Sequence, residues 1–292
     1  MMDDFLTYDF LQNAFLTGIM IGFLAPVLGV FIVVRRLALI TDALSHVTLT
    51  GIAFHLLLAQ SYTSLQAVNP LYMGMVFSTG ASLLMEKLRH VYTAYRELAI
   101  PIILSTGIGL GVVFISLADG FNNDLFNYLF GSIIAVTRED LWAVTIITII
   151  VSGLLLLFYK ELLFLSFDEE QALVSGIPGK LINLLFVVMT AIVIASSMRI
   201  VGILLVSSLM TLPVASAIQL SKSFKQMFVY SVIIGEVSVI TGLFSAFYLD
   251  VSPGGTIVMI ALSILLVVLA CKKMKRTPVK AVHRKMPHTD QG

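Results

Sequence analysis

Long apolar runs alternate with short polar or charged stretches along almost the whole chain. The runs cover residues 12–34, 38–59, 67–86, 98–118, 140–159, 181–197, 200–220, 226–248 and 255–271. A helix needs about 20 mainly apolar residues to cross the hydrocarbon core of a bilayer, so each run is long enough, or nearly so, for one crossing. The pattern predicts an all-α polytopic integral membrane protein with eight to nine transmembrane helices.

Composition supports this class and excludes a soluble enzyme. Of the 292 residues, 58 % are hydrophobic and only 12 % are charged, whereas about 25 % of the residues in soluble domains are charged. The single cysteine excludes an intrachain disulfide. The sequence contains neither a G-x-x-x-x-G-K-[ST] phosphate loop nor an H-E-x-x-H zinc motif. An ATP-driven transporter that contains this chain therefore needs a separate subunit that binds the nucleotide.

Basic residues between the apolar runs predict the orientation of the chain. Arg35-Arg36, residues 87–96, Lys160 and the tail from Lys272 onward belong on the cytoplasmic side by the positive-inside rule. This places the amino terminus outside and the carboxyl terminus inside, with Arg138 and Arg199 as exceptions. We expect an extracytoplasmic segment over 1–11, a permease domain over 12–271 and a cytoplasmic basic tail over 272–292.

Asp42 and His46 are ionisable residues within the second apolar run. Four residues apart, they share one face of a helix. An ionisable group inside a membrane helix costs about 2.5–3.5 kcal/mol on insertion scales and is usually functional. A carboxylate and an imidazole are usable ligands for a divalent transition metal. The spacing also fits a buried Asp–His hydrogen bond that joins two helices, and it leaves both interpretations open.

Two further ionisable residues lie within apolar runs. Glu236 stands between Gly235 and Val237, where it fits a metal ligand, a proton carrier or a hydrogen-bond partner between helices. His55 follows His46 by nine residues, about half a turn away in angle, so one straight helix does not direct both at the same site. We expect His55 nearer the outer surface, in packing or in an entry region.

The polar stretch 165–178 predicts a short amphipathic helix between two spans. Ser166 or Asp168 caps its start, and Glu169 with Glu170 suits the positive end of the helix dipole. Gly176 then ends the helix, and Pro178 prevents its continuation. Such a helix is suited to dock into a groove of a soluble partner, although an ordinary capped surface loop has the same pattern.

Five ordered motifs resemble a known family. They are Val33-Val34-Arg35-Arg36-Leu37 through Asp42-Ala43-Leu44-Ser45-His46 to Gly51, Leu129-Phe130-Gly131 with residues 137–141, the stretch Leu165 to Ile177, the run Met198 to Pro213, and Ser252-Pro253-Gly254-Gly255. Together they resemble the bacterial ABC-importer permeases for zinc and manganese over residues 10–271. One departure is Thr50, which stands where many members of that family have proline.

The resemblance implies a transport subunit without enzyme activity in the bacterial plasma membrane. It implies a homodimeric permease of the type II importer kind, two copies of a cytoplasmic ATP-binding subunit that hydrolyses ATP, and an extracytoplasmic metal-binding protein. Asp42 and His46 match the family's pathway pair. Glu236 and His55 are further candidate metal ligands on their position in apolar runs alone. The coupling segment, which contacts the ATP-binding subunit, includes Ser166, Phe167, Asp168, Glu169, Glu170, Gln171, Ala172 and Gly176.

The transported ion and the energy source have alternatives. The run 194–202 is more similar to the zinc branch, so Zn2+ is the expected cargo and Mn2+ the alternative, with no permanently bound cofactor. A second alternative is an ATP-independent secondary metal transporter or channel, in which Asp42 and Glu236 form a proton relay. A third class, an intramembrane hydrolase, lacks a nucleophile and a base on facing helices.

Overall fold

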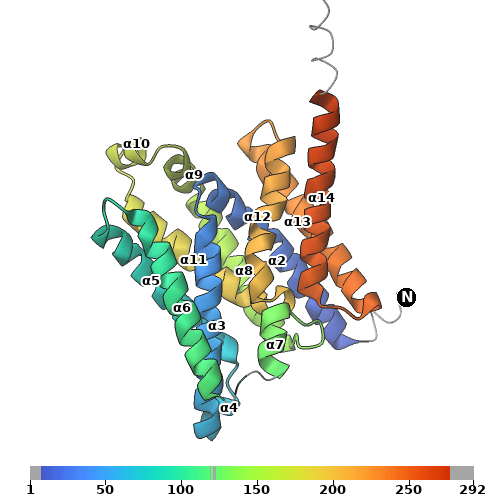
Figure 1. The fold of residues 1–292 in the computed structure, drawn as a ribbon. Coiled ribbons are helices and arrows are strands. Elements are labelled where there is room, and N and C mark those ends of the chain that lie inside the picture. Colours follow the sequence, from blue (N-terminus) through green and yellow to red (C-terminus); the bar gives the residue numbers. More distant parts are fainter. Residues whose placement is uncertain (1–7, 119, 121–122, 277–292) are drawn as a thin grey trace, which may run out of the picture.

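A computed structural model describes residues 8–118, 120 and 123–276 of the chain. The predicted amino-terminal segment lies mostly outside these residues, as does most of the predicted basic tail. Within the described residues the chain is helical, without strands, which confirms the all-α class. The helices, drawn in Figure 1, are α2 Asp9–Val34, α3 Ala38–Ser61, α4 Thr63–Gln66, α5 Pro70–Val91, the 3-10 turn η1 Arg96–Leu98, α6 Ala99–Leu117, α7 Asn123–Phe130, α8 Arg138–Leu157, α9 Tyr159–Phe167, α10 Glu169–Val174, α11 Gly179–Val201, α12 Ile203–Leu220, α13 Phe224–Leu249 and α14 Pro253–Arg276.

Each of the nine predicted apolar runs forms a long helix. Seven segments of the described chain are long and apolar enough to cross a membrane, namely 9–34, 38–61, 96–117, 138–157, 179–201, 224–249 and 253–274. The other two runs correspond to α5 and α12. The last turns of α5 contain Glu86, Lys87 and Arg89, which lower its mean hydropathy, and α12 has only 18 residues.

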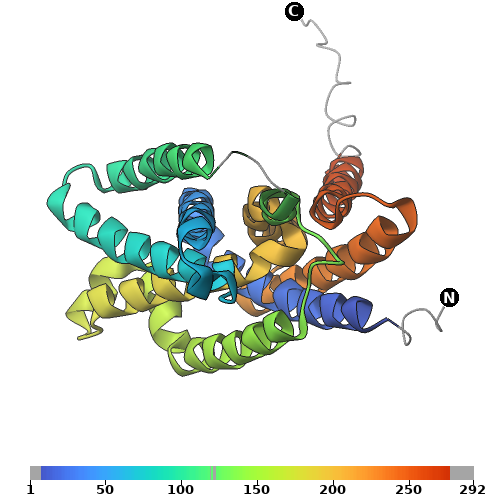
Figure 2. The same cartoon turned by 90° about the horizontal axis from the view of Figure 1, so that it is seen from below.

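The helices pack around α3 and α12. Helix α3 packs against α5 and α6, whereas α12 packs against α2, α13 and α14 and also contacts α3. Figure 2 shows α6 and α8 on opposite sides of the bundle. Glycines bring the helix axes close together: a Cβ on Gly51 would lie 2.7 Å from the Met73 carbonyl of α5, and one on Gly107 of α6 would lie 2.7 Å from a Val47 methyl.

Three glycines, Gly131, Gly202 and Gly254, pack together at a glycine junction where α11 ends and α12 begins. Gly202 has φ +83°, and Gly131 has φ +79°, a region that favours glycine. A Cβ on Gly131 would lie 2.0 Å from the Ile200 carbonyl oxygen, and one on Gly254 would lie 1.8 Å from that of Val201. Three of the sequence motifs therefore meet at one point, where the loop after α7, the end of α11 and the start of α14 touch.

The bundle has two distinct ends, which we name by the partly buried arginine that lies at each, Arg35 or Arg199. The Arg35 end contains α9, α10, the carboxyl ends of α5 and α14 and the α2–α3 turn, while the Arg199 end contains α4, α7 and the start of α2 (Figure 1). Basic residues predicted to be cytoplasmic gather at the Arg35 end, where Arg35, Arg36 and Arg89 line one cavity. Which end faces the cytoplasm stays a prediction.

Candidate functional site

Asp42 and His46 lie on a stripe of α3 that neighbouring helices leave partly open. Thr48 contacts α5 at Gly74, while Val47 faces Gly107 of α6. Asp42 and His46, on the remaining side of the helix, are half-buried, and the intervening residues 43–45 are buried. The predicted shared face is therefore present, and its two ionisable side chains are only partly covered by neighbouring helices.

Thr50 fixes this part of α3 to α6. Its hydroxyl lies 2.6 Å from the carbonyl oxygen of Gly107, to which it donates, and 3.0 Å from that of His46 in the preceding turn. At the position where many members of the resembling family have proline, this chain thus has a hydrogen bond between helices. The bond holds the turn of α3 that carries His46.

The donor set of one chain is incomplete as a metal site. No group of three or more His, Cys, Asp or Glu side chains able to hold a metal occurs in the described part of the chain. Zinc in proteins usually takes four ligands, whereas Asp42 and His46 supply one carboxylate and one imidazole. A two-fold symmetric interface uses the same surface patch of both chains, so an interface at this stripe would bring two carboxylates and two imidazoles together.

His55 lies on a different side of α3 from His46. Its side chain is 2 % exposed and lines a cavity of about 280 Å³ together with Tyr128 and Arg199. The cavity lies at the Arg199 end. The structure does not bring His55 to the Asp42–His46 stripe, as the angular spacing predicts, and its role in binding metal stays a prediction.

Glu236 also lies apart from Asp42 and His46. It faces α2, since a Cβ added to Gly22 would lie 3.2 Å from its Oε2 atom. This oxygen is buried and has no hydrogen-bond partner among the described residues. Helix α13 packs against α2, α12 and α14, so α3 is not its neighbour. A relay that includes both Asp42 and Glu236 would have to cross α2 or α12, and the role of Glu236 stays a prediction.

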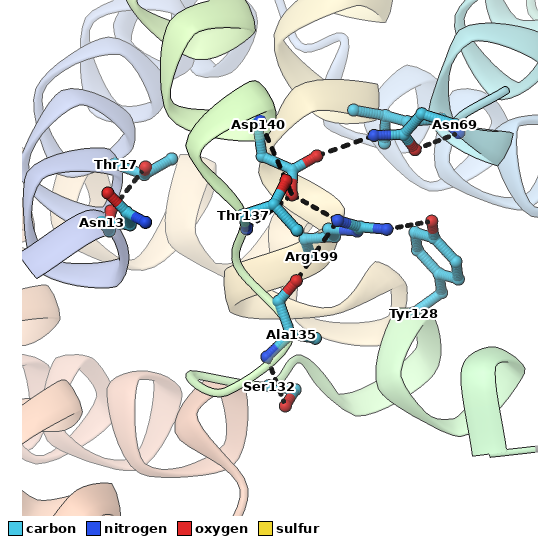
Figure 3. A network of polar contacts seen from close by, with 10 residues as sticks. Asn13, Thr17, Asn69, Tyr128, Ser132, Ala135, Thr137, Asp140 and Arg199 are labelled. Atoms are coloured by element: carbon cyan, nitrogen blue, oxygen red, sulfur yellow. Dashed lines mark hydrogen bonds and ion pairs between the residues drawn. The ribbon is translucent and has the colours of Figure 1, made fainter. Parts of the chain in front are cut away.

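A buried polar network at the Arg199 end was missed by sequence reasoning (Figure 3). Arg199 of α11 pairs with Asp140 of α8 and donates to the Tyr128 hydroxyl of α7 at 3.3 Å. Asn69, which precedes α5, donates to the other Asp140 oxygen at 2.9 Å. Asp140 also completes a capping box with Thr137 at the start of α8. The signal for this network was the exceptional position of Arg199 under the positive-inside rule.

The coupling segment has the predicted local structure. Asp168 caps α10 by accepting a hydrogen bond from the Gln171 amide at 2.9 Å. Gly176 has φ +86°, and the Ile177 amide donates to the Ala172 carbonyl at 3.1 Å, which completes a Schellman ending. Ala172 is fully buried against the bundle. The exposed residues of the stretch 165–178 are Phe167, Glu169, Glu170, Gln171, Leu173, Val174, Ser175, Gly176 and Pro178.

Comparison with known proteins identifies the family. Residues 7–272 match the model described as the ABC 3 transport family. The chain is 35 % identical to a probable metal transport system membrane protein of Treponema pallidum over 93 % of this chain and 98 % of the relative. It is 32 % identical to the manganese transport system membrane protein MntC of Listeria monocytogenes, covering 89 % of this chain and 90 % of that one.

A relative named for zinc has the same identity as the manganese relative MntC. The high-affinity zinc uptake system membrane protein ZnuB of Haemophilus influenzae is 32 % identical over 86 % of this chain and 93 % of its own length. Among solved structures, PsaBC from Streptococcus pneumoniae in complex with Fab superposes with a TM-score of 0.79 at 30 % identity, over 92 % of this chain and 94 % of the matched one. The chain therefore belongs to the ABC 3 transport family, as a transmembrane permease for metal uptake.

Proposed function

We propose that this permease passes a divalent transition metal ion inward along the α3 stripe that contains Asp42 and His46. The observation that carries the proposal is the partial exposure of this carboxylate–imidazole pair on one face of a membrane helix. Charged side chains are expensive in a membrane and usually face a bundle interior or a water-filled path. A pathway site must also release its ion, and a donor set shared between chains suits weak binding.

The complete transporter in this proposal contains two permease chains. A second copy completes the donor set, two cytoplasmic ATP-binding subunits hydrolyse ATP, and an extracytoplasmic protein delivers the metal. The absence of a phosphate-loop motif from the sequence supports a separate ATP-binding subunit. The ATP-binding subunit docks on the coupling segment in this proposal. Leu173 and Val174 of that segment support this, because they are apolar yet 51 % and 90 % exposed at the Arg35 end. This end is cytoplasmic in the proposal, with the bacterial plasma membrane as the location.

Zinc is the first candidate cargo and manganese the second. Imidazole ligands suit zinc, whereas carboxylate and water suit manganese, and the α3 stripe supplies one ligand of each type. Zinc is favoured by the likeness of residues 194–202 to the zinc branch. Manganese is favoured by a specific observation, because the relatives from Listeria monocytogenes and Streptococcus gordonii are named for manganese transport or import.

Growth of a deletion strain tests both the cargo and the site. Cells lacking the gene are grown under zinc chelation and, in parallel, under manganese limitation, and their metal content is measured. We expect the gene to restore growth and metal content, whereas Asp42→Asn and His46→Ala variants reach the membrane, assemble and fail to restore either. Asp250→Asn is the matched control, since Asp250 is exposed at the end of α13 with φ +52°, a conformation that asparagine also tolerates.

Each outcome of this experiment has a consequence. A defect under zinc chelation alone supports zinc, and a defect under manganese limitation alone supports manganese. Normal growth and metal content with both Asp42→Asn and His46→Ala would overturn the pathway assignment. Uptake that continues without the ATP-binding subunit would favour an ATP-independent carrier instead.

A further inference from the structure

A cavity separates the turn between α2 and α3 from the coupling segment. It has a volume of about 240 Å³, and its walls are residues 34–37 of the turn, Arg89 of α5, and residues 165–167 and 169 of the coupling segment. Glu169 is the only acidic residue that lines it. The space leaves room for the coupling segment to approach the turn.

Arg35 projects from this turn and is anchored on α11. Its Nη2 donates to the Asn183 side-chain oxygen, and its guanidinium centre lies 5.5 Å from the centroid of the Phe186 ring, within the range of a cation–π contact. Its Nη1 is buried, with no hydrogen-bond partner in the described part of the chain. Buried donors are rarely left without a partner, so this N–H group is free to donate a hydrogen bond to an acceptor that approaches it.

Glu169 is the acceptor best placed to use it. Burial lowers the pKa of Arg35, and the negative charges of Glu169 and Glu86 oppose this effect, while Arg89 adds to it. Glu86 is engaged within its own helix, since it lies 3.6 Å from both Arg89 and His90. Within the described residues Glu169 forms no ion pair at 4 Å or less, so its carboxylate is available.

The α2–α3 turn is short and tight. The Leu37 amide donates to the Ile32 carbonyl at 2.8 Å, and Arg36 has φ +57°, a conformation that costs energy for a residue other than glycine. Helix α3 begins at Ala38, so only three residues separate the two helices. A displacement of Arg35 therefore moves the start of α3 as well, because the short turn between them cannot absorb it.

We propose that Arg35 is the positioning residue that transmits movement of the coupling segment to α3. When the segment moves toward the turn, Glu169 accepts a hydrogen bond from the free Nη1 of Arg35, and the turn shifts α3 together with Asp42 and His46. This inference rests on the proposed function, because it requires a partner that drives the coupling segment. It adds to that function the residue pair through which the force passes.

The test measures metal transported per ATP hydrolysed. The permease is reconstituted into lipid vesicles with its ATP-binding subunits and metal-binding protein, and Arg35→Gln and Glu169→Gln are compared singly and together. We expect assembly to persist and ATP hydrolysis to continue, while the metal-to-ATP ratio falls about tenfold, within the range of typical coupling between sites. The double variant should be no worse than either single variant, because both remove one interaction.

Two further variants distinguish a coupling role of Arg35 from a purely structural one. Arg36→Gln alters the exposed neighbouring arginine and should keep the wild-type ratio. Arg35→Lys keeps the charge but loses the forked guanidinium, and it should recover part of the ratio. Additive losses in the double variant, or a wild-type ratio with Arg35→Gln, would overturn the relay. A wild-type complex without ATP-dependent metal uptake would overturn the proposed function and the relay with it.

Discussion

Arg199 and Asp140 form the most thoroughly buried ion pair among the described residues. Asp140 is 3 % exposed, and both of its oxygens accept hydrogen bonds from other segments. A buried ion pair is weak evidence for net stability, but removing one partner leaves the other charge uncompensated. The pair also joins α8 to α11 and, through Tyr128 and Asn69, to α7 and the start of α5. The main role of this ion pair is therefore to hold the helices of the Arg199 end together.

We predict that Arg199→Met destabilises the permease by about 3–5 kcal/mol, the usual cost of breaking a buried pair. Thermal unfolding in detergent measures the change. Arg138→Met is the matched control, because Arg138 and Asp9 are about three-quarters exposed in their ion pair, and such a pair contributes about 0–1 kcal/mol. Equal melting temperatures for the two variants would contradict the assigned role of the network.

The contrast between the two polar pairs shows what one sequence can predict about a site. Asp42 and His46 share a helix, so their spacing alone predicts their common face. Arg199 and Asp140 are 59 residues apart on different helices, and no local pattern joins them. Arg35 had a local signal as part of a basic pair, but its contact with Asn183, 148 residues away, depends on the packing of α11 against α2.

At the scale of helices, apolar length was a sufficient signal for every long element. All nine runs became helices, since a continuous apolar segment in a membrane satisfies its backbone hydrogen bonds internally. The short helices α4, α7 and α9 had no such signal. The apolar runs 181–197 and 200–220 were separated in the sequence, but the break at Gly202 depends on backbone atoms of residues 129–131, which only the folded chain brings there.

Gly202→Ala should therefore be severely destabilising. A Cβ at this position would lie 2.5 Å from the Leu129 carbonyl oxygen, and the backbone conformation at φ +83° costs a residue other than glycine about 1–3 kcal/mol before any overlap. The matched control is Gly153→Ala in α8, where nothing lies within 4 Å of the added atom. We expect it to remain within about 1 kcal/mol of the wild type.

The measurement is the yield and thermal unfolding of both glycine variants in detergent. Equal tolerance of alanine at Gly202 and Gly153 would mean that the glycine junction is not closely packed. A selective loss for Gly202→Ala would support the junction as the point that fixes α7, α11 and α14 together.

The whole molecule places the candidate metal ligands and the candidate coupling contacts at different levels of one helix bundle. Asp42 and His46 follow the α2–α3 turn by about one and two helical turns, and the coupling segment lies across a cavity from that turn. One chain supplies only half of a plausible metal site. The proposed path between two copies would account for both the partial exposure of the α3 stripe and the absence of a larger ligand cluster among the described residues.

ATP-dependent uptake of radioactive zinc and manganese into vesicles that contain the full transporter tests whether the α3 stripe is the metal pathway. We predict that the wild type accumulates one of these ions when ATP is present. The Asp42→Asn/His46→Ala double variant should assemble normally, yet lose that uptake, while Asp250→Asn transports as the wild type does. Uptake by the double variant at the wild-type rate would contradict the assignment of Asp42 and His46 to the metal pathway.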